Sequence, residues 1–130
     1  MPNYWYHHIH LASPDPKKTA EFYKDMFNAE IANTRELPDG RVTVELNLGG
    51  SIVLIMQRPA ETEAAASGAS SGLDHFGLRT DDLETTVSNL KGKGVKFRGD
   101  ITELGSRMKI AFFWAPDNVL IELVEIKPRE

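Results

Sequence analysis

The chain contains no cysteine, which excludes disulfide bonds and thiolate metal ligands, so any metal must be held by histidine or carboxylate side chains. No apolar run is long enough to span a bilayer, and we expect no membrane partner. No cluster of lysine and arginine stands out, and the formal net charge is −4, which argues against nucleic acid as a partner. The first residues lack the basic and apolar segments of a signal peptide, which predicts a cytoplasmic protein.

The most unusual stretch covers residues 6–12, which include three of the four histidines of the chain. The fourth, His75, lies in a segment with a similar strand-like pattern, 67 positions after His8. The chain has 130 residues, enough for a single domain with a hydrophobic core. The offset of 67 turns out to relate the two halves of this domain.

Alternating apolar residues between turn signals predict eight strands, at residues 4–12, 30–36, 41–48, 51–58, 73–80, 96–104, 108–114 and 119–126. A helix is predicted after the first strand of each half, the first at about 16–28 and the second capped by Asp81 or Asp82 and stopped by Gly94. The offset of 67 places Asp15, before the first helix, on Asp82, before the second. It also places the hairpin signal Gly49-Gly50 on Pro116-Asp117. The order of elements therefore indicates an internal duplication.

These elements predict an α+β fold made of two βαβββ modules within one domain, 1–130. The modules are residues 4–58 and 73–127, and the small, polar segment 59–72 reads as a linker. Each helix can cover only one face of its four-stranded sheet. We therefore expect two curved mixed sheets to form an open cup, with the helices outside and the histidines inside.

The alternation of side chains along a strand predicts which residues line this cup. Glu122 interrupts an otherwise apolar run, so its carboxylate is costly unless it pairs with a cation or stays wet. Two imidazoles and a carboxylate suit a divalent metal with open positions for substrate or water. The expected cup-lining residues are Tyr6, His8, His10, Val53, Ile55, Gln57, His75, Gly77, Arg79, Leu120, Glu122 and Val124.

Three parts of the chain carry a family resemblance: His8-Ile9-His10-Leu11-Ala12 with Phe22-Tyr23, Asp74-His75-Phe76-Gly77-Leu78-Arg79, and Ala115-Pro116-Asp117-Asn118 leading into Leu120-Ile121-Glu122-Leu123. On these segments the chain resembles the vicinal oxygen chelate superfamily from residue 6 to residue 126. This superfamily includes glyoxalase I, methylmalonyl-CoA epimerases, extradiol dioxygenases, fosfomycin-resistance transferases and bleomycin-binding proteins.

The resemblance implies that His8, His75 and Glu122 bind a divalent metal ion, which could be Fe, Mn, Zn, Ni or Co. In glyoxalases and epimerases a fourth ligand, Gln or Glu, lies on the fourth strand. Subtracting the offset from Glu122 puts that position at Ile55, so we expect three protein ligands. Gln57 has the expected parity but lies one pleat further along, and it is a candidate for binding substrate.

Several other side chains have two interpretations. His10 is a candidate catalytic acid or base, or a hydrogen-bonded filler. Arg79 can bind a substrate carboxylate or phosphate, or form a salt bridge. Phe112 can line the cup or serve for packing. His7 reads as a bystander, and Glu125 as a solvated outward residue.

The favoured function is a metal-dependent enzyme that chelates adjacent oxygens of a small-molecule substrate. Lyase or isomerase chemistry and dioxygenase chemistry both stay open, although Ile55 argues mildly against the glyoxalase and epimerase route. The alternative is a metal-free binding protein that sequesters a small molecule, as in the bleomycin-resistance branch. Many relatives are homodimers, and we expect one here, with each cup formed within one chain or across two.

Overall fold

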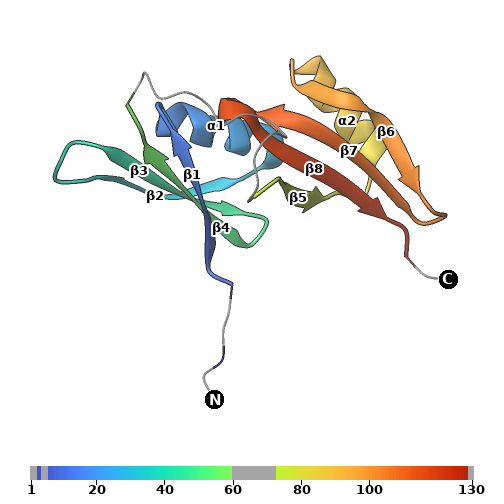
Figure 1. Cartoon of the computed structure of the whole chain (residues 1–130), viewed down its shortest axis with the longest axis horizontal. Coiled ribbons are helices and arrows are strands. Elements are labelled where there is room, and N and C mark those ends of the chain that lie inside the picture. Colours follow the sequence, from blue (N-terminus) through green and yellow to red (C-terminus); the bar gives the residue numbers. More distant parts are fainter. Residues whose placement is uncertain (1–2, 4–5, 60–72, 129–130) are drawn as a thin grey trace. The chain divides into compact units, whose positions relative to one another are not determined.

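The structure is a computed structural model that describes residue 3 and residues 6–59 and 73–128 (Figure 1). The chain divides into two compact units, Met1–Glu63 and Ala64–Glu130, and each is described by itself. The boundary falls in the expected linker, of which residues 60–72 lie outside the described residues. No helix in the described part of the chain has the length and apolar character needed to cross a membrane.

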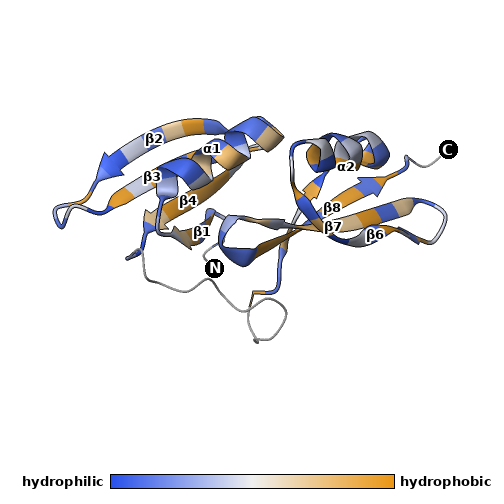
Figure 2. Cartoon of the chain, turned by 90° about the horizontal axis from the view of Figure 1, so that it is seen from above, coloured by the Kyte–Doolittle hydropathy of each residue, from blue (hydrophilic) through white to orange (hydrophobic). Residues whose placement is uncertain are grey.

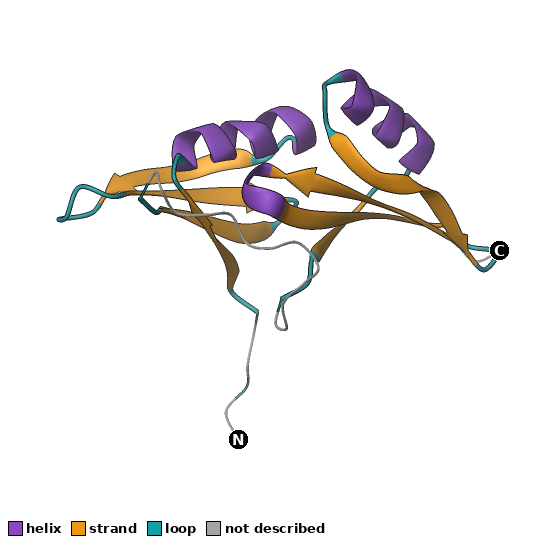
Figure 3. Ribbon diagram, turned by 45° about the horizontal axis from the view of Figure 1, so that its top comes forward, coloured by secondary structure: helices purple, strands orange, loops and turns teal. Residues whose placement is uncertain are grey.

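The first unit is a mixed four-stranded sheet with one helix. Its sheet has the order β1-β4-β3-β2, in which β1 and β4 are parallel and the other neighbours antiparallel. The helix covers one face of this sheet (Figure 3). Its elements are β1 (His8–Ser13), α1 (Pro16–Phe27), β2 (Glu30–Glu36), β3 (Val42–Leu48) and β4 (Ser51–Gln57).

The second unit repeats this arrangement. Its sheet has the order β5-β8-β7-β6, again with the first pair parallel. The predicted α+β class with two βαβββ modules is therefore confirmed. The elements are β5 (Phe76–Arg79), α2 (Leu83–Gly92), β6 (Lys96–Leu104), β7 (Met108–Ala115) and β8 (Val119–Ile126), with a short 3-10 turn, Pro116–Asn118, before β8.

The two helices begin at the predicted residues. The Asp15 carboxylate accepts a hydrogen bond from the Lys18 N–H at 3.2 Å, and Asp82 accepts one from the Thr85 N–H at 3.1 Å. Such caps satisfy backbone donors that have no partner within the helix. The equal roles of these two aspartates, 67 positions apart, support the internal duplication.

Each unit buries apolar side chains between its helix and its sheet, whose strands carry hydrophobic residues along their length (Figure 2). Tyr23 of α1 is fully buried, as are Leu83 of α2 and Phe113 of β7. Burial of this kind supplies most of the free energy that stabilises a small α+β unit. The opposite face of each sheet is not covered by its helix.

The predicted orientation of the β4 side chains is wrong: the set expected on the histidine face lies on the other face of the sheet. His10 lies directly opposite Leu54 in the parallel pair β1–β4, and Leu11 lies opposite Ile55. Leu11 and Ile55 are 8% and 0% exposed, so they face α1. The side chains on the histidine face of β4 are therefore Ile52, Leu54 and Met56, and not Val53, Ile55 and Gln57.

The physical reason is the length of one hairpin. Two residues, Gly49 and Gly50, join β3 to β4, whereas three residues, Pro116–Asn118, join β7 to β8. The extra residue changes the offset between the last strands from 67 to 68. In the register of the sheets Leu54 opposes His10, and Glu122 opposes Gly77, which is the counterpart of His10. The counterpart of Glu122 is thus Leu54 rather than Ile55, and it is again an apolar residue.

Candidate metal centre

The second unit brings together two of the predicted metal ligands, His75 and Glu122. His75 immediately precedes β5, and Glu122 lies on the adjacent strand β8, opposite Gly77. The Nε2 atom of His75 is 3.4 Å from Oε1 of Glu122. Both side chains remain accessible, with exposed fractions of 32% and 21%. They form a partly exposed pair on the sheet face that α2 leaves uncovered.

Asp74 orients the imidazole of this pair. Its Oδ2 atom lies 2.8 Å from Nδ1 of His75, on the side of the ring away from Glu122. A carboxylate at Nδ1 favours a proton on that nitrogen and leaves the lone pair on Nε2. Metal-binding histidines usually have such a partner behind them. Asp74 was not predicted as a functional residue.

With Asp74 at Nδ1, the Nε2 atom of His75 and the Oε1 atom of Glu122 face one another. Two lone pairs at this separation repel one another unless a proton or a metal ion lies between them. Two ligands bound to one ion at about 2.1 Å lie about 3.0–3.4 Å apart. The separation of 3.4 Å between Nε2 and Oε1 fits that requirement. The donor set, one imidazole nitrogen and one carboxylate oxygen, suits a divalent metal.

The first unit repeats the arrangement around its own histidine. Nδ1 of His8 lies 2.8 Å from Nδ1 of His7, and the two rings meet edge to face with their centroids 5.1 Å apart. His7 precedes His8 as Asp74 precedes His75, 67 positions later. His7 is exposed, and its contact with the neighbouring His8 was not predicted. In both histidines the preceding residue contacts Nδ1, so Nε2 is the ring nitrogen left for a metal ion.

The described residues contain no group of three His, Asp or Glu side chains gathered as a complete metal site. The second unit contributes the pair His75 and Glu122, and His8 belongs to the first unit. The assignment of all three as ligands of one ion thus remains a prediction.

His10 shares a sheet face with His8 and is exposed. Burial of part of its ring lowers the pKa of His10 below the ordinary value of 6.5, and the positive charges of Arg58 and His8 lower it further. The neutral imidazole is therefore the dominant form of His10 at pH 7 in the metal-free protein. This placement keeps His10 as a candidate proton acceptor.

The lowered pKa of His10 predicts a pH dependence. Because the folded protein binds this proton less tightly than the unfolded chain, the stability from His10 is complete above pH 6.5 and declines as the pH falls below it. Replacing Arg58 with glutamine should raise the pKa of His10 without restoring 6.5, because burial is the larger cause. Histidine NMR titrations of the metal-free parent and of the Arg58→Gln variant measure the pKa of His10 in each protein. An unchanged pKa in the variant would contradict the proposed coupling.

Phe112 lies on the sheet face that carries His75 and Glu122. It sits directly opposite Glu122 in the antiparallel pair β7–β8. Its ring meets the His75 ring edge to face, with centroids 5.2 Å apart. On β6 the guanidinium carbon of Arg98 lies 4.5 Å from the centroid of the same ring. Arg98 was not predicted as a functional residue.

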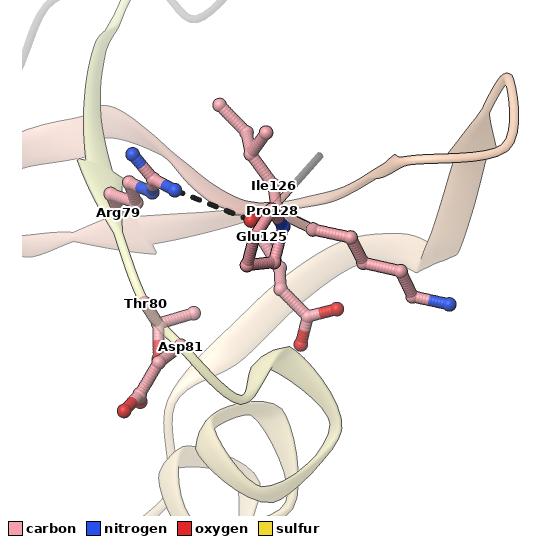
Figure 4. Close-up of a pocket in the computed structure, with 7 residues that line it drawn as sticks. Arg79, Thr80, Asp81, Glu125, Ile126 and Pro128 are labelled. Atoms are coloured by element: carbon pink, nitrogen blue, oxygen red, sulfur yellow. Dashed lines mark hydrogen bonds between the residues drawn. The ribbon is translucent and has the colours of Figure 1, made fainter. Parts of the chain in front are cut away.

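Arg79 adjoins a cavity of about 710 Å³ at the end of β5 (Figure 4). Its Nη2 atom donates a hydrogen bond to the Ile126 carbonyl at 3.2 Å. The salt bridge, one of its two interpretations, does not occur among residues 6–59 and 73–128. Glu125, expected to be solvated, accepts a hydrogen bond from the Leu83 N–H at 2.9 Å and caps α2. The cavity is lined by Arg79, Thr80, Asp81, Glu125, Ile126, Lys127 and Pro128.

Gln57 does not lie where it was expected. It pairs with Ser13, which is buried on the side of α1, and not with the face of the histidines. Its Oε1 atom accepts a hydrogen bond from the Val42 N–H at 3.0 Å, which joins β3 and β4 where they end. Like Ile55, Gln57 lies on the face of β4 opposite to the one predicted, because the offset of 67 does not hold for this strand. Gln57 therefore has no part in the proposed site.

Comparison with known proteins now identifies the family. The model of the Glyoxalase/Bleomycin resistance protein/Dioxygenase superfamily matches residues 5–123. The chain belongs to this superfamily. Its resemblance to vicinal oxygen chelate proteins is thereby confirmed.

Three relatives represent the range of the superfamily. Mitochondrial methylmalonyl-CoA epimerase of Mus musculus is 27% identical over 125 residues, which cover 89% of this chain and 70% of the relative. Lactoylglutathione lyase GLX1 of Arabidopsis thaliana is 24% identical, over 93% of this chain but 44% of its own length. The structure of the fosfomycin resistance protein FosX of Listeria monocytogenes superposes with a TM-score of 0.76 at 19% identity, covering 98% of this chain and 96% of FosX. The epimerase and the lyase indicate an enzyme, and the FosX structure shows the same fold.

Proposed function

We propose that the chain is a metal-dependent isomerase or lyase that binds a small carbonyl compound through adjacent oxygens and moves a proton next to the carbonyl. His8, His75 and Glu122 are the proposed metal ligands. The observation that carries the proposal is the pair His75 and Glu122, with facing atoms 3.4 Å apart and Asp74 at the other ring nitrogen. The matching contact of His7 with His8 supports the third ligand.

The proposed cofactor is a divalent ion held by two imidazoles and one carboxylate. When bound, such an ion acts as a Lewis acid toward the carbonyl oxygen of the substrate. Mn(II) is the ion named for a crystal structure of FosX, which supports a divalent ion here. The choice among Fe, Mn, Zn, Ni and Co is open to direct metal analysis.

His10 is the proposed acid and base of the reaction. It lies two residues from His8 on the same face of β1, and its imidazole can accept a proton from substrate carbon and return it. The relatives that act as an epimerase and as a lactoylglutathione lyase favour this proton chemistry over dioxygenation. Opposite His10, Leu54 supplies neither a metal ligand nor a base, which leaves the proton transfer to His10.

Deuterium exchange tests this function directly. The protein, loaded in turn with Mn, Co, Ni and Zn, is incubated in deuterated water with methylmalonyl-CoA or with the adduct of methylglyoxal and glutathione. We expect deuterium to enter the carbon beside the carbonyl of one of these compounds and the exchange to stop with a chelator. His10→Asn should slow the exchange by a factor of about 10²–10⁴ while the metal remains bound.

Three results would contradict the proposal. Absence of exchange with every metal and both compounds would exclude the proton chemistry, and oxygen consumption with a catechol would indicate a dioxygenase instead. Tight binding of a small molecule without any metal would favour the sequestering function. A homodimer, as in many relatives, is compatible with the proposal, because the three ligands can come from one chain or from two.

A further inference from the structure

Arg98 stacks on the aromatic ring next to the proposed metal ligands. Its guanidinium carbon is 4.5 Å from the centroid of Phe112, which in turn contacts His75 at a centroid distance of 5.2 Å. The strand register places Arg98 opposite Phe112, and Phe112 opposite Glu122. These three residues therefore form one row across the uncovered sheet face of the second unit. The guanidinium carbon lies no more than about 10 Å from the His75 ring.

The hydrogen-bond donors of Arg98 have no acceptor among residues 6–59 and 73–128. Two exposed arginines, by contrast, have acceptors, since Arg107 donates to the Lys127 carbonyl and Arg41 pairs with the Asp39 carboxylate. A guanidinium stacked on a ring keeps its five N–H groups in its own plane, directed away from the ring. Arg98 thus lies over the ring with no acceptor for its donors in the described part of the chain, and a guanidinium can bind a carboxylate through two of these donors.

The backbone next to Arg98 is irregular. The pairing of β6 with β7 shifts register between Arg98 and Thr102. Gly99, the residue after Arg98, has a φ angle of +79°, a region that favours glycine. Bulges of this kind bend a strand and change the direction of a side chain, and they are frequent near active sites. The regular register thus ends immediately after Arg98, while Arg98 itself remains paired with Phe112.

We infer that Arg98 binds a carboxylate of the substrate that is remote from the oxygens held at the metal. The inference rests on the proposed function, because it takes the other end of the substrate to lie at His75 and Glu122. Phe112 is the platform that positions the guanidinium. The substrate class is then a small acid with two adjacent oxygens at one end and a carboxylate within a few bonds of them.

Two 2-oxo acids that differ at one end test the inference by calorimetry on the metal-loaded protein. 2-Oxoglutarate and 2-oxopentanoate offer the metal the same pair of oxygens, and only the first has a distal carboxylate. We expect 2-oxoglutarate to bind about 10-fold more tightly. Arg98→Gln should abolish this preference and leave the affinity for 2-oxopentanoate unchanged. Arg107→Gln, an exposed arginine on the β6–β7 hairpin, is the matched control and should retain the preference.

The outcomes separate this inference from the proposed function. If 2-oxopentanoate binds as tightly as 2-oxoglutarate, or if the preference persists in Arg98→Gln, the role of Arg98 is overturned while the metal site stands. If neither compound binds when metal is present, the chelating function fails, and the inference fails with it. A thermal melt of Arg98→Gln equal to that of the parent shows that any lost preference is not caused by unfolding.

Discussion

Replacing Ile55 with glutamate is expected to unfold the first unit at neutral pH. The Ile55 side chain is fully buried beneath α1, where an unpaired carboxylate costs several kcal/mol. That cost is comparable to the whole stability of a small domain, which is about 5–15 kcal/mol. Urea denaturation followed by circular dichroism should show loss of the cooperative transition, or a midpoint far below that of the parent protein.

The neighbouring substitution Leu54→Glu is the matched control. Leu54 is only half-buried and lies on the face of His10, so a carboxylate there can reach solvent. We expect its stability to change by less than about 1 kcal/mol. If Leu54→Glu unfolded the protein and Ile55→Glu did not, the register of β1 and β4 would be wrong, and the parity predicted from sequence would be right.

The second large effect concerns Glu122. Its replacement with alanine should lower the rate of deuterium exchange by about 10³-fold and weaken metal binding, because the carboxylate paired with His75 Nε2 is removed. Glu122→Gln keeps the shape but not the charge and should show a large part of the same loss. Steady-state kinetics with a metal titration measure both effects.

Glu84→Gln is a suitable control for this experiment. Glu84 forms an ion pair with Lys109 at the surface, with Nζ and Oε1 3.2 Å apart, and it lies on α2 rather than on the uncovered sheet face. We expect kinetics and metal affinity of this variant to equal those of the parent. Metal affinity that is unchanged in Glu122→Ala would remove Glu122 from the ligand set.

Much of the fold could be predicted from the sequence because its signals are local. Asp15 and Asp82 mark the helix starts, and the hairpin residues mark the strand ends. The offset between His8 and His75 then related the halves. The face of Glu122 was predictable because a charged residue interrupts an apolar strand. Its pairing with His75 agrees with that expectation.

The face of β4 could not be predicted in the same way. Residues 52–56 are all apolar, so their alternation carries no polar signal to identify the buried face. The prediction for β4 therefore relied on a constant offset of 67 between the two halves. The extra residue in the turn Pro116–Asn118 makes the offset between β4 and β8 68. Side chains alternate between the two faces of a strand, so one inserted residue moves every predicted side chain of that strand to the opposite face.

The partners of the histidines were also missed, although a signal for them exists. His7 and Asp74 are related by the same offset as His8 and His75, yet their residue types differ, which hid the equivalence. Arg98 was missed for another reason. The bulge after it on β6 obscures the alternation along the strand, so its position opposite Phe112 emerges only from the paired strands.

The central claim is that one divalent ion is bound by His8, His75 and Glu122 together. Histidine ¹⁵N NMR during a zinc titration tests it most directly, because the chain has only four histidines. We expect the Nε2 signals of His8 and His75 to shift together and to stop shifting at one zinc ion per chain, while both Nδ1 atoms keep their protons or hydrogen bonds. A His75 signal that shifts while His8 stays unchanged, or two transitions at different zinc concentrations, would contradict the claim.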